Sequence, residues 1–131
     1  GLLGFFKYGT FVLENFTPGR LAAWGMGYED LAAVNPGVIL THVSGFGQTG
    51  PYAERPAYDV IAQAMGGIMS LTGHEGGPPT RVGSSIGDLG AGLFTALGIV
   101  AALHDRTRTG QGMLIDVAML DSPPPLEQTL P

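Results

Sequence analysis

Asp88 is the carboxylate whose neighbours best suit covalent chemistry in this sequence. Gly87 precedes it, and Gly90 and Gly92 follow it at the start of a long apolar run. Glycine has no side chain, so a second backbone or a ligand can approach closely there. Asp is also favoured at helix N-termini, where the helix dipole stabilises its charge. The same dipole favours the ionised form that a carboxylate nucleophile needs, so helix capping and nucleophilic attack both stay open for Asp88.

A second polar segment lies between predicted elements. Tyr58-Asp59 follows Arg55-Pro56 and is either the start of a helix or a polar pair that faces a site. Residue types alone do not separate these two interpretations.

Residues 45–50 read GFGQTG and match the glycine pattern of a dinucleotide-binding turn after a predicted strand. That turn needs a helix that starts within the glycines, so that helix amides meet the pyrophosphate. Here Pro51 and Pro56 bracket an irregular stretch instead. We therefore interpret residues 45–56 as a turn-rich loop whose backbone amides could still line a ligand.

The residue types in this sequence do not favour metal binding or a thiolate nucleophile. His42, His74 and His104 lie far apart, with no cysteine or spaced carboxylate cluster around them, so no metal site is predicted. The absence of Cys excludes a thiolate nucleophile and fits a reducing compartment, from which we expect a cytoplasmic protein. No Gly-x-Ser-x-Gly elbow occurs, which disfavours a hydrolase of that kind.

Composition limits the class of protein. The 131 residues include 22 Gly and 10 Pro, yet 44% are hydrophobic, which excludes a disordered or collagen-like chain. Only 13% are charged, about half the share usual for a solvated globule, so we expect part of the surface to be covered. The net charge of -5 leaves no basic stripe for nucleic acid, and no nucleic-acid partner is predicted.

Glycine and proline divide the chain into alternating strand-like and helix-like units. The expected strands are residues 11–13, which also suit a buried turn of helix, and residues 38–43, 81–86 and 114–117. The expected helices open at residue 18 and cover 28–34, 58–69 and 88–103, with the apolar stripe of 58–69 in the core. This alternation predicts an α/β fold with parallel strands joined by helical crossovers.

Three stretches bear on the limits of the domain. Residues 89–103 carry no charge but are shorter than the roughly 20 residues of a membrane span, so we expect a buried helix and no membrane partner. The apolar residues 1–7 lack the features of a signal peptide and are interpreted as an interior segment. Residues 1–131 are expected to form a single partial domain, with a Pro-rich, irregular tail over 122–131.

Taken in order, the motifs resemble a known family. They are Glu14-Asn15-Phe16-Thr17-Pro18-Gly19, Gly27-Tyr28-Glu29-Asp30-Leu31, Asn35-Pro36, the segment 44–52, Arg55-Pro56-Ala57-Tyr58-Asp59, the segment 62–67, Asp88 and the segment 116–121. This series is similar to the class III CoA-transferases, which include formyl-CoA transferase, carnitine CoA-transferase and the α-methylacyl-CoA racemases. The resemblance covers most of this chain but a minority of a full member, the central part of its large domain.

The resemblance implies transfer of CoA from an acyl-CoA donor to a carboxylic acid. Asp88 matches the residue that attacks the thioester to give an aspartyl anhydride and then an aspartyl-CoA thioester. CoA is then a substrate, and no tightly bound cofactor is expected. Full members are interlocked homodimers, so this chain alone is expected to be inactive.

The resemblance also assigns contacts with CoA. Asn15, Phe16 and Thr17 match a segment that touches CoA, and Tyr58-Asp59 matches a Tyr-acidic pair beside the reacting carboxylate. Ala23 stands where many members place a basic residue facing CoA phosphate, which leaves Arg20 or Arg55 to substitute for it.

Two alternative functions remain. Racemase members carry His where this chain has Tyr58, and a neutral phenol is a poorer proton shuttle than imidazole near pH 7, which favours the transferase. A non-catalytic module for CoA binding or oligomerisation is the other alternative.

Overall fold

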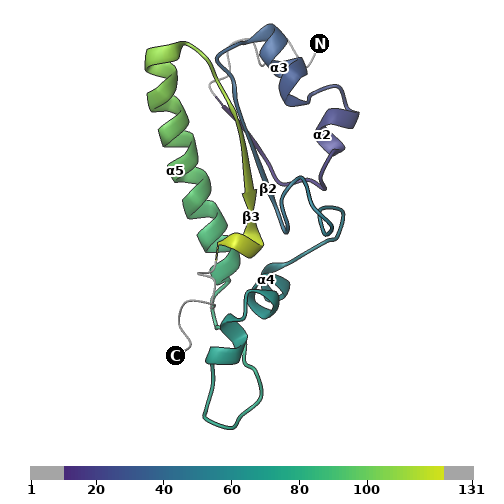
Figure 1. Cartoon of the computed structure of the whole chain (residues 1–131), viewed down its shortest axis with the longest axis vertical. Helices are drawn as coiled ribbons and strands as arrows, with labels where there is room; N and C mark the ends of the chain where they lie inside the picture. The colour runs from purple at the N-terminus through teal and green to yellow at the C-terminus, as the bar shows by residue number, and fades with distance from the viewer. Residues whose placement is uncertain (1–10, 123–131) are drawn as a thin grey trace.

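Residues 11–122 form a three-stranded parallel sheet with helices on both faces in a computed structural model (Figure 1). The strands are β1 (Phe11–Glu14), β2 (Ile39–Ser44) and β3 (Leu114–Ala118), in the order β1-β2-β3. The helices are α2 (Arg20–Ala23), α3 (Tyr28–Val34), α4 (Asp59–Met65) and α5 (Ile86–Thr109), with 3-10 turns η1 (Ile68–Leu71) and η2 (Met119–Asp121). The predicted α/β class and the parallel pairing are confirmed.

Side chains of the central strand β2 pack into two separate hydrophobic clusters, one on each face of the sheet. Leu40 of β2 packs with Leu21 of α2 and Leu31 of α3 on one face of the sheet. Val43, three residues on, packs instead against the cluster that holds Ala91 of α5. Successive side chains of a strand point to opposite faces, so β2 serves both layers. Figure 1 accordingly shows α5 on one side of the sheet and α2 and α3 on the other.

Local signals account for α3, whose predicted range 28–34 is confirmed. The carboxylate of Asp30 accepts a hydrogen bond from the backbone N–H of Gly27, 3.0 Å away, which satisfies a free donor at the helix start. Asn35 has an extended backbone at the helix end, as expected before Pro36. The residues that determine where α3 begins and ends therefore lie within the helix or directly next to it.

The predicted strand over residues 81–86 is wrong. These residues form irregular chain, and α5 already begins at Ile86. The backbone N–H of Val82 donates to Gln63 Oε1 over 2.8 Å, and the carbonyl of Ser84 accepts from Gln63 Nε2 over 3.2 Å. A side chain of α4 thus supplies partners that a neighbouring strand would otherwise supply.

The expected core stripe on residues 58–69 is also wrong for most of its members. Ile61 and Met65 are exposed, whereas Ala62 and Gln63 are buried. Helix α4 approaches α5 closely through the small side chain of Ala62, which belongs to the same cluster as Ala91. Small side chains let two helices pack close together, and the larger apolar ones then face outward.

Helix α5 is longer than the predicted range 88–103, and the expectation of a buried helix is wrong, because the described chain covers only one side of it. Its buried side chains are small or medium in size, as with Ala91, Thr95 and Ile99. Its large apolar residues are exposed within the described chain, namely Leu89, Leu93, Phe94, Leu97 and Val100. By length and composition α5 could cross a membrane, but a single such helix is weak evidence because core helices meet the same criteria. The segment 1–7, which we interpret as an interior segment, and the Pro-rich tail beyond Ser122 lie outside the described residues.

Gly112, which follows α5, packs closely against the segment that leads into β2. Its N–H donates to the carbonyl of Pro36 over 2.8 Å, and a Cβ there would collide with the carbonyl of Val38. We expect Gly112→Ala to destabilise the complete gene product by about 1–3 kcal/mol, because buried backbone must shift to admit the methyl group.

Thermal unfolding measures this effect, and Gly92→Ala is the matched control. Gly92 lies in α5 with nothing within 4 Å of a Cβ. The added methyl should leave stability unchanged or raise it by up to about 1 kcal/mol, because Ala favours helix over Gly. Equal melting temperatures for the two variants would contradict the predicted clash at position 112.

Candidate active site

A cavity of about 530 Å³ opens at the carboxyl edge of the sheet. Its walls come from the residues after β1, the end of β2, the residue after β3, and the starts of α4 and α5. Parallel strands place all their carboxyl ends at one edge, where ligands bind in open α/β sheets. The residues that line the cavity are Asn15, Phe16, Thr17, Pro18, Val43, Ser44, Gly45, Glu54, Arg55, Pro56, Ala57, Tyr58, Asp88 and Met119.

The segment 15–17 is held by the last residue of β1. Glu14 is buried, and its Oε2 accepts a hydrogen bond from the N–H of Phe16 over 2.6 Å. Its other oxygen contacts Nδ1 of His42, which is its register partner on β2. The Phe16 ring meets Trp24 edge-on, with 5.3 Å between centroids. A polar pair inside the sheet therefore orients one wall of the cavity.

The two ends of the loop over residues 45–56 also line the cavity. The prediction of this loop as irregular chain is confirmed, since α4 does not begin until Asp59. Gly47 and Gly50 have φ of 83° and 97°, values that glycine adopts without strain. The Arg55 guanidinium carbon lies 4.4 Å from the centroid of the Tyr52 ring. This cation–π contact orients Arg55, the one Lys or Arg side chain that lines the cavity within residues 11–122.

Asp88 is the third residue of α5 and not its N-cap, which is Ser85. It is exposed, lines the cavity, and makes no side-chain hydrogen bond within residues 11–122. Tyr58 lines the same cavity and is 79% exposed. One cavity thus holds both a carboxylate at the positive end of a long helix and a phenol.

Asp59 points elsewhere, although it is adjacent to Tyr58 in sequence. It is 7% exposed and does not line the cavity. Its Oδ1 accepts from the N–H of Gly87 over 2.8 Å, and its Oδ2 accepts from Gln63 Nε2 over 2.7 Å. Sequence reasoning did not single out Gln63. The available signal was its position one helical turn after Asp59, on the same face of α4.

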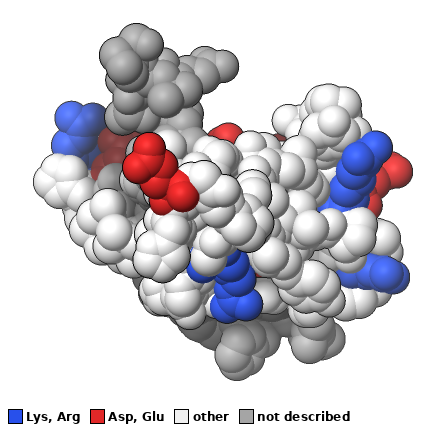
Figure 2. Space-filling view, turned by 90° about the horizontal axis from the view of Figure 1, so that it is seen from below, with Lys and Arg blue, Asp and Glu red and all other residues white. Residues whose placement is uncertain are grey.

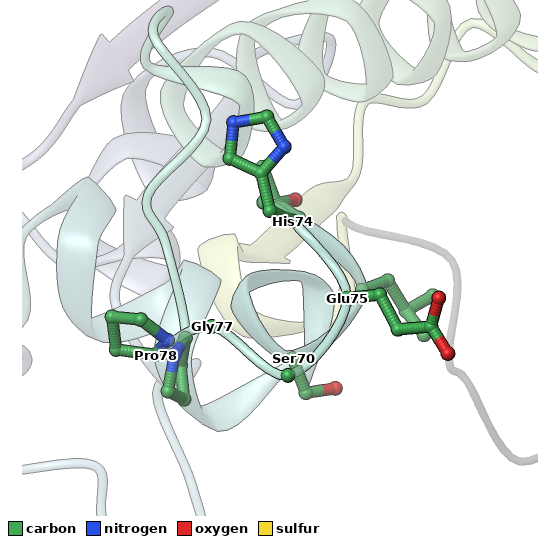
Figure 3. Close-up of a pocket in the computed structure, with 10 residues that line it drawn as sticks. Ser70, His74, Glu75, Gly77 and Pro78 are labelled. Carbon is green, nitrogen blue, oxygen red and sulfur yellow. The ribbon is translucent and has the colours of Figure 1, made fainter.

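A second hollow lies at the far end of the molecule. It is enclosed by a single run of chain, residues 70–79, with a volume of about 370 Å³. Figure 3 shows the side chains of His74 and Glu75 directed away from one another and from the centre of the loop. Among the described residues its lining comes from this one run of chain, and the two titratable side chains in it do not converge (Figure 3). Within residues 11–122, no three metal-ligating side chains cluster.

Charged side chains are sparse on the face that Figure 2 shows. A few Lys or Arg and Asp or Glu groups, some of them next to a group of opposite charge, stand on a largely uncharged surface. On that face the described residues form no continuous basic patch.

Comparison with known proteins decides the family. The family model for CoA-transferase family III matches residues 10–126. The chain belongs to CoA-transferase family III. The α/β sheet, the cavity at its edge and the motif order all agree with that membership.

Relatives of this family III chain carry CoA-transferase names. It is 54% identical over 110 residues to succinyl-CoA–D-citramalate CoA-transferase of Chloroflexus aurantiacus, covering 84% of this chain and 27% of that protein. It is 56% identical over 109 residues to acetyl-CoA:oxalate CoA-transferase of Acetobacter aceti, covering 82% of this chain and 28% of that protein. The chain therefore spans about a quarter of the length of these relatives.

A solved structure supports the same fold. A CAIB/BAIF family protein from Brucella suis superposes with a TM-score of 0.88 at 43% identity. The superposition covers 92% of this chain and 32% of that one.

The fold brings together all but one of the site residues that the sequence predicted. Asn15, Phe16, Thr17, Arg55, Tyr58 and Asp88 line one cavity, and Asp59 is buried behind it. Their roles in binding and catalysis stay predictions.

The Glu14 contact with Phe16 leads to a prediction. In the complete gene product, Glu14→Ala should leave the Phe16 N–H and the His42 ring without their partner and destabilise this region by about 1–3 kcal/mol. Hydrogen exchange of the Phe16 amide should accelerate. Glu29→Ala, on the exposed side of α3, is the control and should leave that amide protected. Unchanged exchange in Glu14→Ala would contradict the assigned role.

Proposed function

We propose that the complete protein transfers CoA from an acyl-CoA donor to a carboxylic acid, with Asp88 as the nucleophile. One observation carries this proposal: the exposed Asp88 carboxylate, which makes no side-chain hydrogen bond within residues 11–122, lines one cavity together with the segment 15–17, Arg55 and Tyr58. The family resemblance assigns the segment 15–17 to CoA and Tyr58 to the neighbourhood of the reacting carboxylate, and it leaves Arg55 to substitute for the basic residue that Ala23 replaces. Family membership supports CoA transfer in general, and the mechanism below is our proposal.

The first half of the reaction charges Asp88 with CoA. A carboxylate oxygen of Asp88 attacks the donor thioester carbonyl, the C–S bond breaks, and the CoA thiolate leaves. This forms a mixed anhydride between Asp88 and the donor acyl group. The thiolate then attacks the Asp88 carbonyl carbon and releases the donor acid as a carboxylate. An aspartyl-CoA thioester remains, and one difficult exchange has become two easier steps.

The second half reverses these steps with a new acid. The acceptor carboxylate attacks the aspartyl-CoA thioester and expels the CoA thiolate, which forms a second mixed anhydride. Attack of the thiolate on the acceptor acyl carbon yields the new acyl-CoA and regenerates the Asp88 carboxylate. The complete cycle consumes no net proton or electron.

The remaining cavity residues bind and orient. We assign Asn15, Phe16 and Thr17 to CoA, and Arg55 to its phosphate groups, because a guanidinium pairs with phosphate oxygens. Tyr58 lies where its hydroxyl can donate a hydrogen bond to an oxygen of the reacting groups. The names of the relatives include citramalate, oxalate and glutarate, and we propose an acceptor of this carboxylic-acid class. Homodimer formation and a cytoplasmic location stay predictions.

Asp88→Asn tests the nucleophile in the complete gene product. CoA exchange between an acyl-CoA and a carboxylate should fall by about 10⁴-fold or more, because a neutral amide cannot form the anhydride. Asp105→Asn, at the other end of α5, is the matched control and should retain turnover. Hydroxylamine added with acyl-CoA should convert Asp88 to a hydroxamate that mass spectrometry locates. Normal turnover in Asp88→Asn would refute the mechanism.

The isolated chain of residues 1–131 should show no CoA exchange. It covers about a quarter of the length of its relatives, so substrate contacts from the remaining three quarters are missing. The same assay run on the isolated chain and on the complete gene product checks this. Turnover by the isolated chain would show that these residues suffice.

A further inference from the structure

Gln63 is the most completely engaged polar side chain near the candidate site. Its relative exposure is 0%, and both ends of its amide are used. The Oε1 atom accepts from the Val82 N–H, while Nε2 donates to Asp59 Oδ2 and to the Ser84 carbonyl. A backbone N–H can only donate, so the amide oxygen must face Val82 and the amide nitrogen must face the two acceptors. Its orientation is therefore determined by its partners.

Asp59 connects Gln63 to the start of α5 through hydrogen bonds of its two carboxylate oxygens. Its Oδ1 accepts from the N–H of Gly87, a donor in the first helical turn that has no partner within the helix. Ser85, the N-cap residue, makes no side-chain cap hydrogen bond. A carboxylate from α4 thus caps α5 in place of the helix's own residue, in a position that the helix dipole also favours.

The contact is close enough to position the next residue. A Cβ on Gly87 would lie 3.1 Å from Asp59 Oδ1 and 3.3 Å from the Ala62 Cβ. The backbone at Gly87 therefore has little room to move toward α4. Asp88 follows directly, and its side chain enters the cavity.

We propose that Gln63 is a positioning residue for Asp88, acting through Asp59 and through the backbone of residues 82–87. This inference rests on the proposed function, because it assigns the network to the placement of the nucleophile. Gln63 does not line the cavity, so it acts by geometry alone. A displacement of about 1 Å at a reacting group can lower a rate by about 100-fold.

The pattern of donors and acceptors suggests paired variants. In Asp59→Asn, the new amide nitrogen faces another donor, so one hydrogen bond is lost. In Gln63→Glu, two carboxylates face each other and the Ser84 carbonyl loses its donor. In the double variant, the amide at position 59 can accept from Gly87 and donate to the carboxylate at position 63, which also accepts from Val82. The Ser84 carbonyl still lacks its donor there, so recovery is expected to be partial. The double variant also restores the original net charge.

The experiment measures kcat and KM for CoA exchange in the complete gene product. Each single variant should lower kcat by about 10- to 100-fold, with the KM for acyl-CoA changed less than about twofold, because the segment 15–17 and Arg55 are untouched. The double variant should recover kcat to within about tenfold of the parent protein. Hydrogen exchange at Val82 and Gly87 should accelerate in the singles and slow again in the double variant.

Thr72→Val controls for the loss of an unrelated hydrogen bond. The Thr72 hydroxyl donates to the Ile68 carbonyl over 2.8 Å, away from the cavity, and its loss should leave kcat unchanged. Full kcat in both single variants would overturn the inference, as would a double variant that is folded but no faster than the singles. A fall in kcat matched by a rise in KM would indicate general loosening and would also overturn it. Turnover in Asp88→Asn would instead refute the proposed function, whatever the behaviour of Gln63.

Discussion

Parallel pairing of β1, β2 and β3 is the constraint on which the site depends. Each strand must be reached by a crossover, so the chain leaves every carboxyl end at the same edge and returns over a face of the sheet. Residues after β1, β2 and β3 therefore meet at that edge. The starts of α4 and α5 lie there too, because both helices belong to the crossover between β2 and β3. Helix amides and strand-end side chains converge without any sequence proximity.

Two buried ionic or polar networks hold this edge in shape. Glu14 and His42 join neighbouring strands and orient the segment 15–17. Asp59 and Gln63 join two helices and orient the start of α5. Buried polar groups are costly unless they are fully paired, so these partners fix one arrangement and penalise others. Asp88 belongs to neither network and remains exposed in the cavity, as its proposed role as nucleophile requires.

The low share of charged residues has a structural counterpart in α5. Small side chains face the sheet, where Gly98 lies close to Ile115, and bulky apolar residues such as Leu93 and Leu97 face outward. The short uncharged run over residues 89–103 predicted a buried helix, but its length could not show that this chain buries only one side of it. The chain spans about a quarter of its relatives' length. Within the described residues the low share of charged residues is explained in part by this uncovered, apolar face of α5.

The sequence alone determined the elements whose signals are local. Helix α3 begins after Gly27 and ends before Pro36, both of which lie next to it in the sequence. The loop over residues 45–56 is likewise determined by glycines and prolines that lie within it. The motif order was enough to indicate the family, and Asp88 stood out by its glycines. Only the tertiary structure decided that Tyr58 faces the cavity while Asp59 turns inward. That choice depends on Gly87, which lies 28 residues away in the chain, and a contact between distant residues leaves no periodic signal. The same reason explains why the predicted strand over residues 81–86 is wrong. The backbone groups of Val82 and Ser84 pair with side-chain atoms of Gln63, which is also distant in the sequence.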